Sequence, residues 1–118
     1  MSTLLRQYLA CRATEASAPV PEPEPFSRRA VRAILEAPGL QRREGQLRMA
    51  ELVAQVLAGE RRETAAAIEA GTGTGKSLAY LVPVMMHCVE TGKRAVVATA
   101  TKTLQEQIIR KDAPFVAE

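Results

Sequence analysis

A glycine-rich stretch in the second half of the chain constrains its fold more than any other feature. Residues 70–77 read Ala70-Gly71-Thr72-Gly73-Thr74-Gly75-Lys76-Ser77. Three glycines in five positions allow a tight turn that brings backbone N–H groups against an anion. In a loop of this kind the lysine reaches the terminal phosphates of a nucleotide, and the hydroxyl group after it holds a magnesium ion. The strict pattern has glycine where Ala70 stands, so the match is to the looser form that begins with alanine.

The residues on either side predict the structure that such a loop requires. Residues 64–70 can form a short buried strand, although alanine is a weak strand former. The segment from Lys76 to about Val89 is apolar and long enough for a helix. The order of strand, loop and helix places the anion at a helix N-terminus, which is partially positive. A glycine turn here can be purely structural, but Gly75-Lys76-Ser77 in register favours a nucleotide.

We therefore predict a nucleotide site in which Lys76 and Ser77 serve catalysis and Ser77 also holds magnesium. The predicted nucleotide-binding residues within the loop are Gly71, Thr72, Gly73, Thr74, Gly75, Lys76 and Ser77.

Length and composition limit the possible domain size, partners and cellular location of the protein. The 118 residues amount to one small domain or a piece of a larger one. A net charge of +3 suits an anionic partner. Two isolated cysteines form neither a metal-binding spacing nor a disulfide framework, and no signal peptide is evident, so we expect a cytoplasmic protein. The most apolar stretch, residues 78–89, is too short to cross a bilayer, so we expect no membrane partner.

The first 25 residues differ in character from the rest. Residues 2–12 predict a short amphipathic helix, and residues 13–25 contain four prolines at alternate positions, which favours an extended spacer. The helix either folds back on the domain and frays, or it serves as a docking peptide for a protein partner. We divide the chain into this extension, residues 1–25, and a domain at residues 26–118.

Within residues 26–118 the pattern predicts an α/β fold. Helices are expected at residues 27–37, 44–58 and about 104–111, the last one opened by a capping box of Thr103 and Glu106 and closed before Pro114. A second strand is expected at residues 95–98. Two parallel strands joined by a right-handed crossover do not make a finished sheet, so the segment reads as the N-terminal part of a larger P-loop domain.

Two further groups of residues have the chemistry of ligand contacts. Gln46, at the start of the third helix, can read the edge of adenine with its amide, and Arg43 can support it. The second group follows the 95–98 strand and offers hydroxyl groups, exposed N–H groups and an ammonium to a phosphate backbone: Thr99, Thr101, Lys102 and Thr103. Ordinary helix capping by Thr101 or Thr103 is the alternative.

Three of these segments together resemble the DinG branch of the XPD-like superfamily 2 DNA helicases. They are Arg43-Glu44-Gly45-Gln46, Glu69 through Pro83, and Ala98 through Gln107, in the order and spacing of that family over about residues 38–116. The resemblance implies a RecA-like motor domain, here incomplete. It also implies that Gln46 belongs to the adenine-recognising Q motif, Lys76 and Ser77 to motif I, and residues 99–107 to motif Ia, which grips single-stranded DNA.

The resemblance implies a function as well: ATP- and magnesium-dependent movement 5′→3′ along single-stranded DNA. The acidic motif II box, the arginine finger and the cysteines that hold an iron–sulfur cluster in many members match nothing in these residues. We expect this segment alone to hydrolyse almost no ATP.

Two other interpretations remain. Residues 1–37 can act as an interaction module that recruits the helicase to a partner complex, as in the CRISPR-associated branch of the family. The chain can also belong to another P-loop nucleotide enzyme, such as a small kinase.

Overall fold

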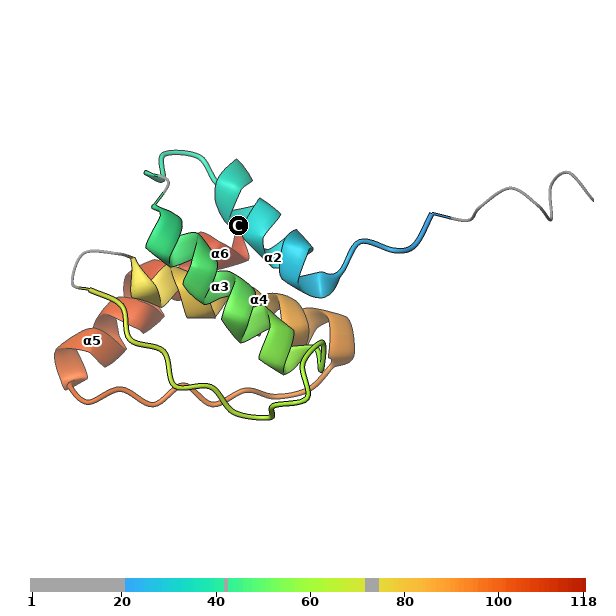
Figure 1. The fold of residues 1–118 in the computed structure, drawn as a ribbon. Coiled ribbons are helices and arrows are strands. Elements are labelled where there is room, and N and C mark those ends of the chain that lie inside the picture. The colour runs from blue at the N-terminus through green and yellow to red at the C-terminus, as the bar shows by residue number, and fades with distance from the viewer. Residues whose placement is uncertain (1–20, 42, 72–74) are drawn as a thin grey trace, which may run out of the picture.

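The structure is a computed structural model that describes residues 21–41, 43–71 and 75–118 (Figure 1). Its regular elements in chain order are α2 (Phe26–Glu36), α3 (Glu44–Leu57), α4 (Lys76–Thr91), α5 (Lys102–Gln107), the π-helical turn η1 (Ile108–Asp112) and α6 (Ala113–Ala117). Helix α4 is the centre of the assembly, because α2, α3, η1 and α6 all contact it. The predicted N-terminal helix and most of the proline-rich spacer lie outside the described residues.

Small side chains let the three main helices approach closely. Ala30 of α2, Ala50 and Ala54 of α3, and Ala79 of α4 are all fully buried. The distance between packed helices depends on the side chains at the contact, so alanine at these positions brings the backbones together. Larger residues fill the space around them, with Met86 against the Phe26–Ala30–Ala54 cluster.

The first helix of this group is anchored from a distant part of the chain. Pro25 precedes α2 and provides no side-chain cap. The buried Ser27 donates its backbone N–H to Oε1 of Glu60 at 3.0 Å, across 33 residues. A carboxylate at a helix N-terminus satisfies an otherwise unpaired donor and is favoured by the helix dipole. The turn after α3 therefore fixes the start of α2.

The predicted positions of the helices before and after the glycine loop are confirmed to within a few residues. Helix α2 begins one residue before the predicted start at 27, and α3 covers the predicted 44–58 except its last residue. Helix α4 begins at Lys76 and continues two residues beyond Val89, where Gly92 ends it in the left-handed conformation (φ 70°). None of the helices in the described ranges has the length and hydropathy needed to cross a membrane.

The two predicted strands are wrong for the part of the chain that the structure describes. Residues 64–70 and 95–98 belong to no strand, and the side chain of Val96 is 95% exposed. A parallel strand is held by hydrogen bonds to neighbouring strands and by cover on both faces. Within the described residues these segments have neither neighbouring strands nor cover on both faces. The alanine side chains are small, so they bury little apolar area that could stabilise a strand in another way.

The last predicted helix is longer than expected and is capped differently. Thr101, and not Thr103, caps α5: its Oγ1 accepts the N–H of Leu104 at 3.2 Å. The helical path then continues through η1 and α6 past Pro114, which lies in the first turn of α6. A proline ring inside a regular α-helix collides with the carbonyl group four residues earlier. The wider π turn immediately before Pro114 gives room at that point.

Candidate nucleotide-binding site

The start of α3 is joined to the end of the glycine loop by one side chain. Gln46 is buried, with 4% of its surface exposed, and its Nε2 donates to the carbonyl oxygen of Gly75 at 3.1 Å. Gly75 is the N-cap of α4, so this bond lies directly before the two loop residues with the most specific predicted roles. Gln46 is predicted to contact the adenine base, and the structure shows that its amide contacts the last glycine of the loop.

Gly75 occupies a position that favours glycine. Its φ of 77° lies in the left-handed region that side chains with a Cβ rarely adopt. A Cβ at this position would also collide with Nε2 of Gln46 and approach its Cδ to 3.1 Å. The backbone conformation therefore favours glycine, and a Cβ would also displace the Gln46 amide.

The other end of the Gln46 amide has no hydrogen-bond partner among the residues that the structure describes. Its Oε1 is buried and accepts no hydrogen bond from the described residues. A buried acceptor without a donor costs about 1–3 kcal/mol. The orientation of the amide follows from its bond to the Gly75 carbonyl, because the opposite orientation would set two oxygens against each other. An unsatisfied acceptor beside a phosphate loop fits a ligand that brings an N–H group.

The phosphate-facing residues begin α4. Lys76 is exposed and Ser77 is half-buried, at the first two positions of a 16-residue helix. The first N–H groups of a helix have no partner within it, and no acidic residue lies in the first turn to repel an anion. Gly71 is exposed, whereas Thr72, Gly73 and Thr74 lie outside the described residues. The residues present fit a nucleotide with magnesium at Ser77.

The structure does not bring Arg43 to Gln46 within the described residues. Arg43 is the N-cap of α3, and its Nη2 donates to Oε1 of Gln41 in the preceding loop at 3.5 Å. Its side chain is exposed and free to turn, so its predicted supporting role stays a prediction.

Two hydroxyl groups of the threonine-rich segment form hydrogen bonds within the segment and the helix that follows it. The Thr99 hydroxyl donates to the carbonyl oxygen of Thr101 at 3.2 Å, and the Thr101 hydroxyl caps α5. Lys102 and Thr103 are exposed at the start of α5. The capping alternative is therefore confirmed for Thr101, while Lys102 and Thr103 stay the residues best placed for a phosphate backbone.

A second cluster, which the sequence analysis did not identify, holds the far end of α4. Arg29 of α2 forms a two-pronged ion pair with Glu90, in which Nη2 and Oε2 are 3.1 Å apart. The ring of Phe26 packs edge-on against His87 with centroids 6.0 Å apart, and the Arg29 guanidinium lies 5.5 Å from the Phe26 centroid. Hydrogen bonding from Arg29 lowers the pKa of Glu90. These contacts tie α2 to α4 at the end opposite the phosphate loop.

No group of three or more histidine, cysteine or acidic side chains that could hold a metal ion occurs in the described ranges. The magnesium predicted at Ser77 requires no such group, because magnesium in phosphate sites is bound through one or two carboxylates together with substrate phosphates and water.

Known proteins match this chain in sequence. The family model of the DEAD/DEAH box helicases matches residues 46–115, from Gln46 through the end of the threonine segment and the helices after it. The 3′-5′ exonuclease DinG of Staphylococcus aureus strain USA300 is 44% identical over 80 residues, and the same protein of strain NCTC 8325 matches equally. No solved structure matches the chain.

The match covers 68% of this chain but only 9% of those relatives, so the chain spans about a tenth of their length. The resemblance to DinG is confirmed over this segment. The family match extends over more than half of the chain, and the chain belongs to the DEAD/DEAH box helicase family.

Proposed function

We propose that the full-length protein is a cytoplasmic ATP-dependent DNA helicase of the DinG type, and that this segment supplies its ATP-binding portion. The observation that carries the proposal is the buried Oε1 of Gln46 beside Gly75, which accepts no hydrogen bond from the described part of the chain. The family match to the helicases and the similarity to DinG over 80 residues support it.

The amide of Gln46 has the hydrogen-bond donor and acceptor that match the N7/N6 edge of adenine. Its Oε1 accepts from none of the described residues and would accept the exocyclic N–H of adenine. The Nε2 group carries a second hydrogen besides the one bonded to Gly75, and that hydrogen would donate to N7. Guanine presents an acceptor where adenine presents that amine, so it would leave the amide oxygen unpaired. Since Gln46 is only 4% exposed, the base must move the side chain or the loop to reach it.

At the other end of the nucleotide, Lys76 would neutralise phosphate charge and the hydroxyl of Ser77 would hold magnesium, which draws negative charge from the transferred phosphoryl group. The helix N-terminus at Gly75 adds unpaired N–H groups. The resemblance to the DinG branch is the basis for two further parts of the proposal. The protein moves 5′→3′ along single-stranded DNA, and Lys102 and Thr103 contact the phosphate backbone of that strand.

The division of the chain at residues 25 and 26 is part of this proposal. Residues 21–25 are exposed and form no regular structure, whereas Phe26 is buried in the core. Burial therefore supports a motor segment that begins at Phe26. Residues 1–25 would then be free to contact a protein partner.

The test uses the full-length protein with Lys76→Ala. We expect loss of DNA-stimulated ATP hydrolysis and of unwinding, with unchanged thermal stability because Lys76 is exposed. The control is Lys93→Ala, an equally exposed lysine at the other end of α4. Unwinding of substrates with a 5′ or a 3′ single-stranded tail reads out the direction. Nucleotide hydrolysis by Lys76→Ala at the wild-type rate would overturn the proposal.

A further inference from the structure

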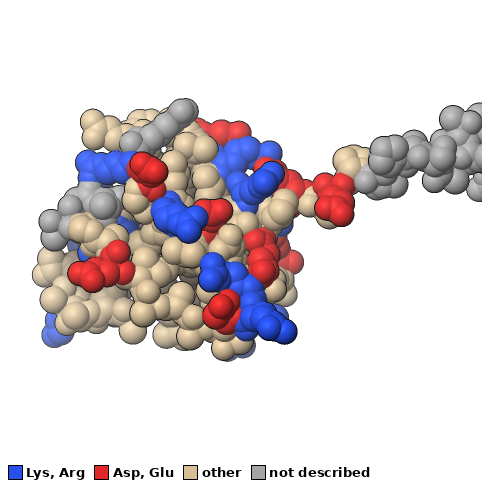
Figure 2. All heavy atoms as spheres, viewed as in Figure 1, with Lys and Arg blue, Asp and Glu red and all other residues tan. Residues whose placement is uncertain are grey.

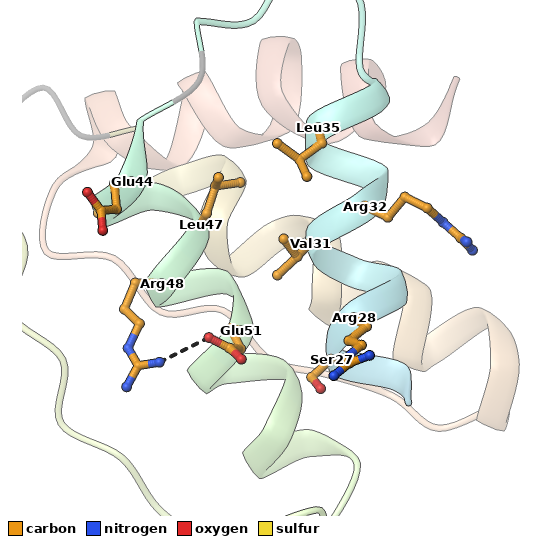
Figure 3. Close-up of a pocket in the computed structure, with 10 residues that line it drawn as sticks. Ser27, Arg28, Val31, Arg32, Leu35, Glu44, Leu47, Arg48 and Glu51 are labelled. Atoms are coloured by element: carbon orange, nitrogen blue, oxygen red, sulfur yellow. Dashed lines mark hydrogen bonds and ion pairs between the residues drawn. The ribbon is translucent and has the colours of Figure 1, made fainter. Parts of the chain in front are cut away.

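A groove between α2 and α3 lies outside the nucleotide site. It has a volume of about 750 Å³ and is bounded only by residues of these two helices. Val31, Leu35 and Leu47 point into the space between the helices and form an aliphatic floor (Figure 3). All three are half-buried, so they keep apolar area that a further element could cover. A groove between two packed helices accepts the apolar face of a third helix.

The two ends of the groove carry opposite charge. Arg28 lies at the end where α2 begins, and Glu44 lies at the opposite end, where α3 begins (Figure 3). Neither side chain has an ion-pair partner within the described residues. The two other charges that face the groove from α3, Arg48 and Glu51, neutralise each other at 3.1 Å. The remaining Arg32 is turned to Glu24, at 2.8 Å.

From this arrangement we propose that the groove docks an amphipathic helix of a protein partner, with the N-terminus of that helix at Arg28 and its C-terminus at Glu44. Helices favour acidic residues in their first turn and basic residues in their last. Such a helix would place its acidic turn against Arg28 and its basic turn against Glu44. The stretch from Arg28 to Leu35 spans about 11 Å of helix axis, which matches about two turns of a partner.

Other occupants fit less well. Single-stranded nucleic acid binds through basic grooves and aromatic platforms. This groove has an aliphatic floor, no aromatic residue in its lining, and both arginines and glutamates at its edge. Figure 2 shows acidic and basic side chains interspersed over the visible face, not a continuous basic field. The chain's own segment 2–12 contains Arg6 and Arg12 but no acidic residue to place against Arg28.

The test measures binding of a designed peptide to the full-length protein by fluorescence anisotropy. The peptide is a helix of about 12 residues, with leucines at i, i+3, i+4 and i+7, glutamates in its first turn and lysines in its last. A second peptide has the lysines and glutamates exchanged. We expect wild-type protein to bind the first peptide about tenfold more tightly than the second. Arg28→Glu should remove or reverse that preference, Val31→Ala should weaken binding of both peptides, and the control Arg62→Glu should change neither.

Several outcomes would overturn the proposal. They are absence of binding, equal binding of the two peptides, or a preference that survives in Arg28→Glu. Displacement of the peptide by single-stranded DNA would assign the groove to nucleic acid. Peptide binding that appears only when Leu5→Asp is introduced would show that the chain's own N-terminal segment occupies it. Circular dichroism of each variant confirms that the helices are retained.

Discussion

Gln46 and Gly75 are 29 residues apart in the chain, are joined by one hydrogen bond and are in close contact. The amide Nε2 lies 3.1 Å from the Gly75 carbonyl oxygen, and a Cβ on Gly75 would overlap the same nitrogen. The adenine-reading candidate is therefore in direct contact with the last glycine of the phosphate loop.

Gly75→Ala should damage both stability and nucleotide binding. A non-glycine residue in the left-handed region costs about 1–2 kcal/mol, and the overlap with Gln46 adds to this. We expect the free energy of unfolding to fall by about 2 kcal/mol or more and ATP affinity to fall because Gln46 is pushed aside. Thermal denaturation and isothermal titration with a non-hydrolysable ATP analogue measure the two effects.

Gly59→Ala is the matched control for that substitution. Gly59 has a similar φ of 69°, but a Cβ there would meet nothing within 4 Å. It should show the backbone cost alone, about 1–2 kcal/mol, with unchanged ATP affinity. Equal effects of the two substitutions on affinity would mean that contact with Gln46 is irrelevant to binding.

Gln46→Met should separate stability from binding. The change removes a hydrogen bond with a net value of about 1 kcal/mol, but it also removes a buried, unpaired oxygen that costs about 1–3 kcal/mol. The Gly75 carbonyl still accepts the N–H of Ala79 at 3.2 Å, so it is not left unpaired. We expect stability without nucleotide to be unchanged or higher, while ATP affinity falls towards that for GTP.

The control for Gln46→Met is Gln55→Met in the same helix, where the amide oxygen faces Arg61 at 3.4 Å. Nucleotide affinity should not change. A large loss of stability in Gln46→Met without nucleotide would contradict the unpaired state of Oε1.

The helices could be predicted from the sequence because their signals are local. Pro38-Gly39 and Gly59 follow the predicted helices at 27–37 and 44–58, and the apolar spacing of residues 44–58 is visible within one helix. The strands could not be predicted correctly, since their stability depends on partners far away in the chain or outside it. Residues 95–98 have the composition of a strand, yet Val96 is almost fully exposed.

The candidate site likewise contains residues that a local motif predicts and contacts that join distant parts of the chain. Lys76 and Ser77 follow from a contiguous motif, and their place at the start of α4 agrees with it. The bond between Gln46 and Gly75 joins two elements, and no short-range pattern encodes it. The same holds for Arg29 and Glu90, which are 61 residues apart. Only their opposite charges and helical positions give a signal, and many other pairs in the sequence share it.

The ion pair between Arg29 and Glu90 should make stability depend on pH in the acidic range. Hydrogen bonding from Arg29 is the main cause of the lowered pKa of Glu90, and the charges of Arg29 and His87 add to it. A carboxylate whose pKa is lower in the folded state stabilises the fold above its unfolded pKa of about 4.3. That stabilisation is lost as the pH falls through the lowered value.

Glu90→Gln should therefore lower the melting temperature at pH 7 and have no effect below both pKa values. Added salt should reduce the difference at pH 7, since both side chains are partly exposed. Glu51→Gln, which removes an ion pair within α3, is the control and should have a smaller effect. A difference between wild type and Glu90→Gln that is constant from pH 7 to pH 3 would argue against the ion pair as its source.

Lys102 and Thr101 are adjacent, and their substitutions should have different consequences in the full-length protein. If Lys102 contacts one DNA phosphate, Lys102→Ala should reduce the slope of log affinity against log salt concentration by about 0.7, the value for a single-stranded phosphate. Thr101→Val removes the hydroxyl that accepts the Leu104 N–H, so it should cost about 1 kcal/mol of stability and leave the slope unchanged. Binding of a single-stranded oligonucleotide at several salt concentrations measures the slope, and Lys93→Ala serves as the charge control. A change of slope in Thr101→Val equal to that in Lys102→Ala would mean that the cap, and not the ammonium group, determines how this segment meets DNA.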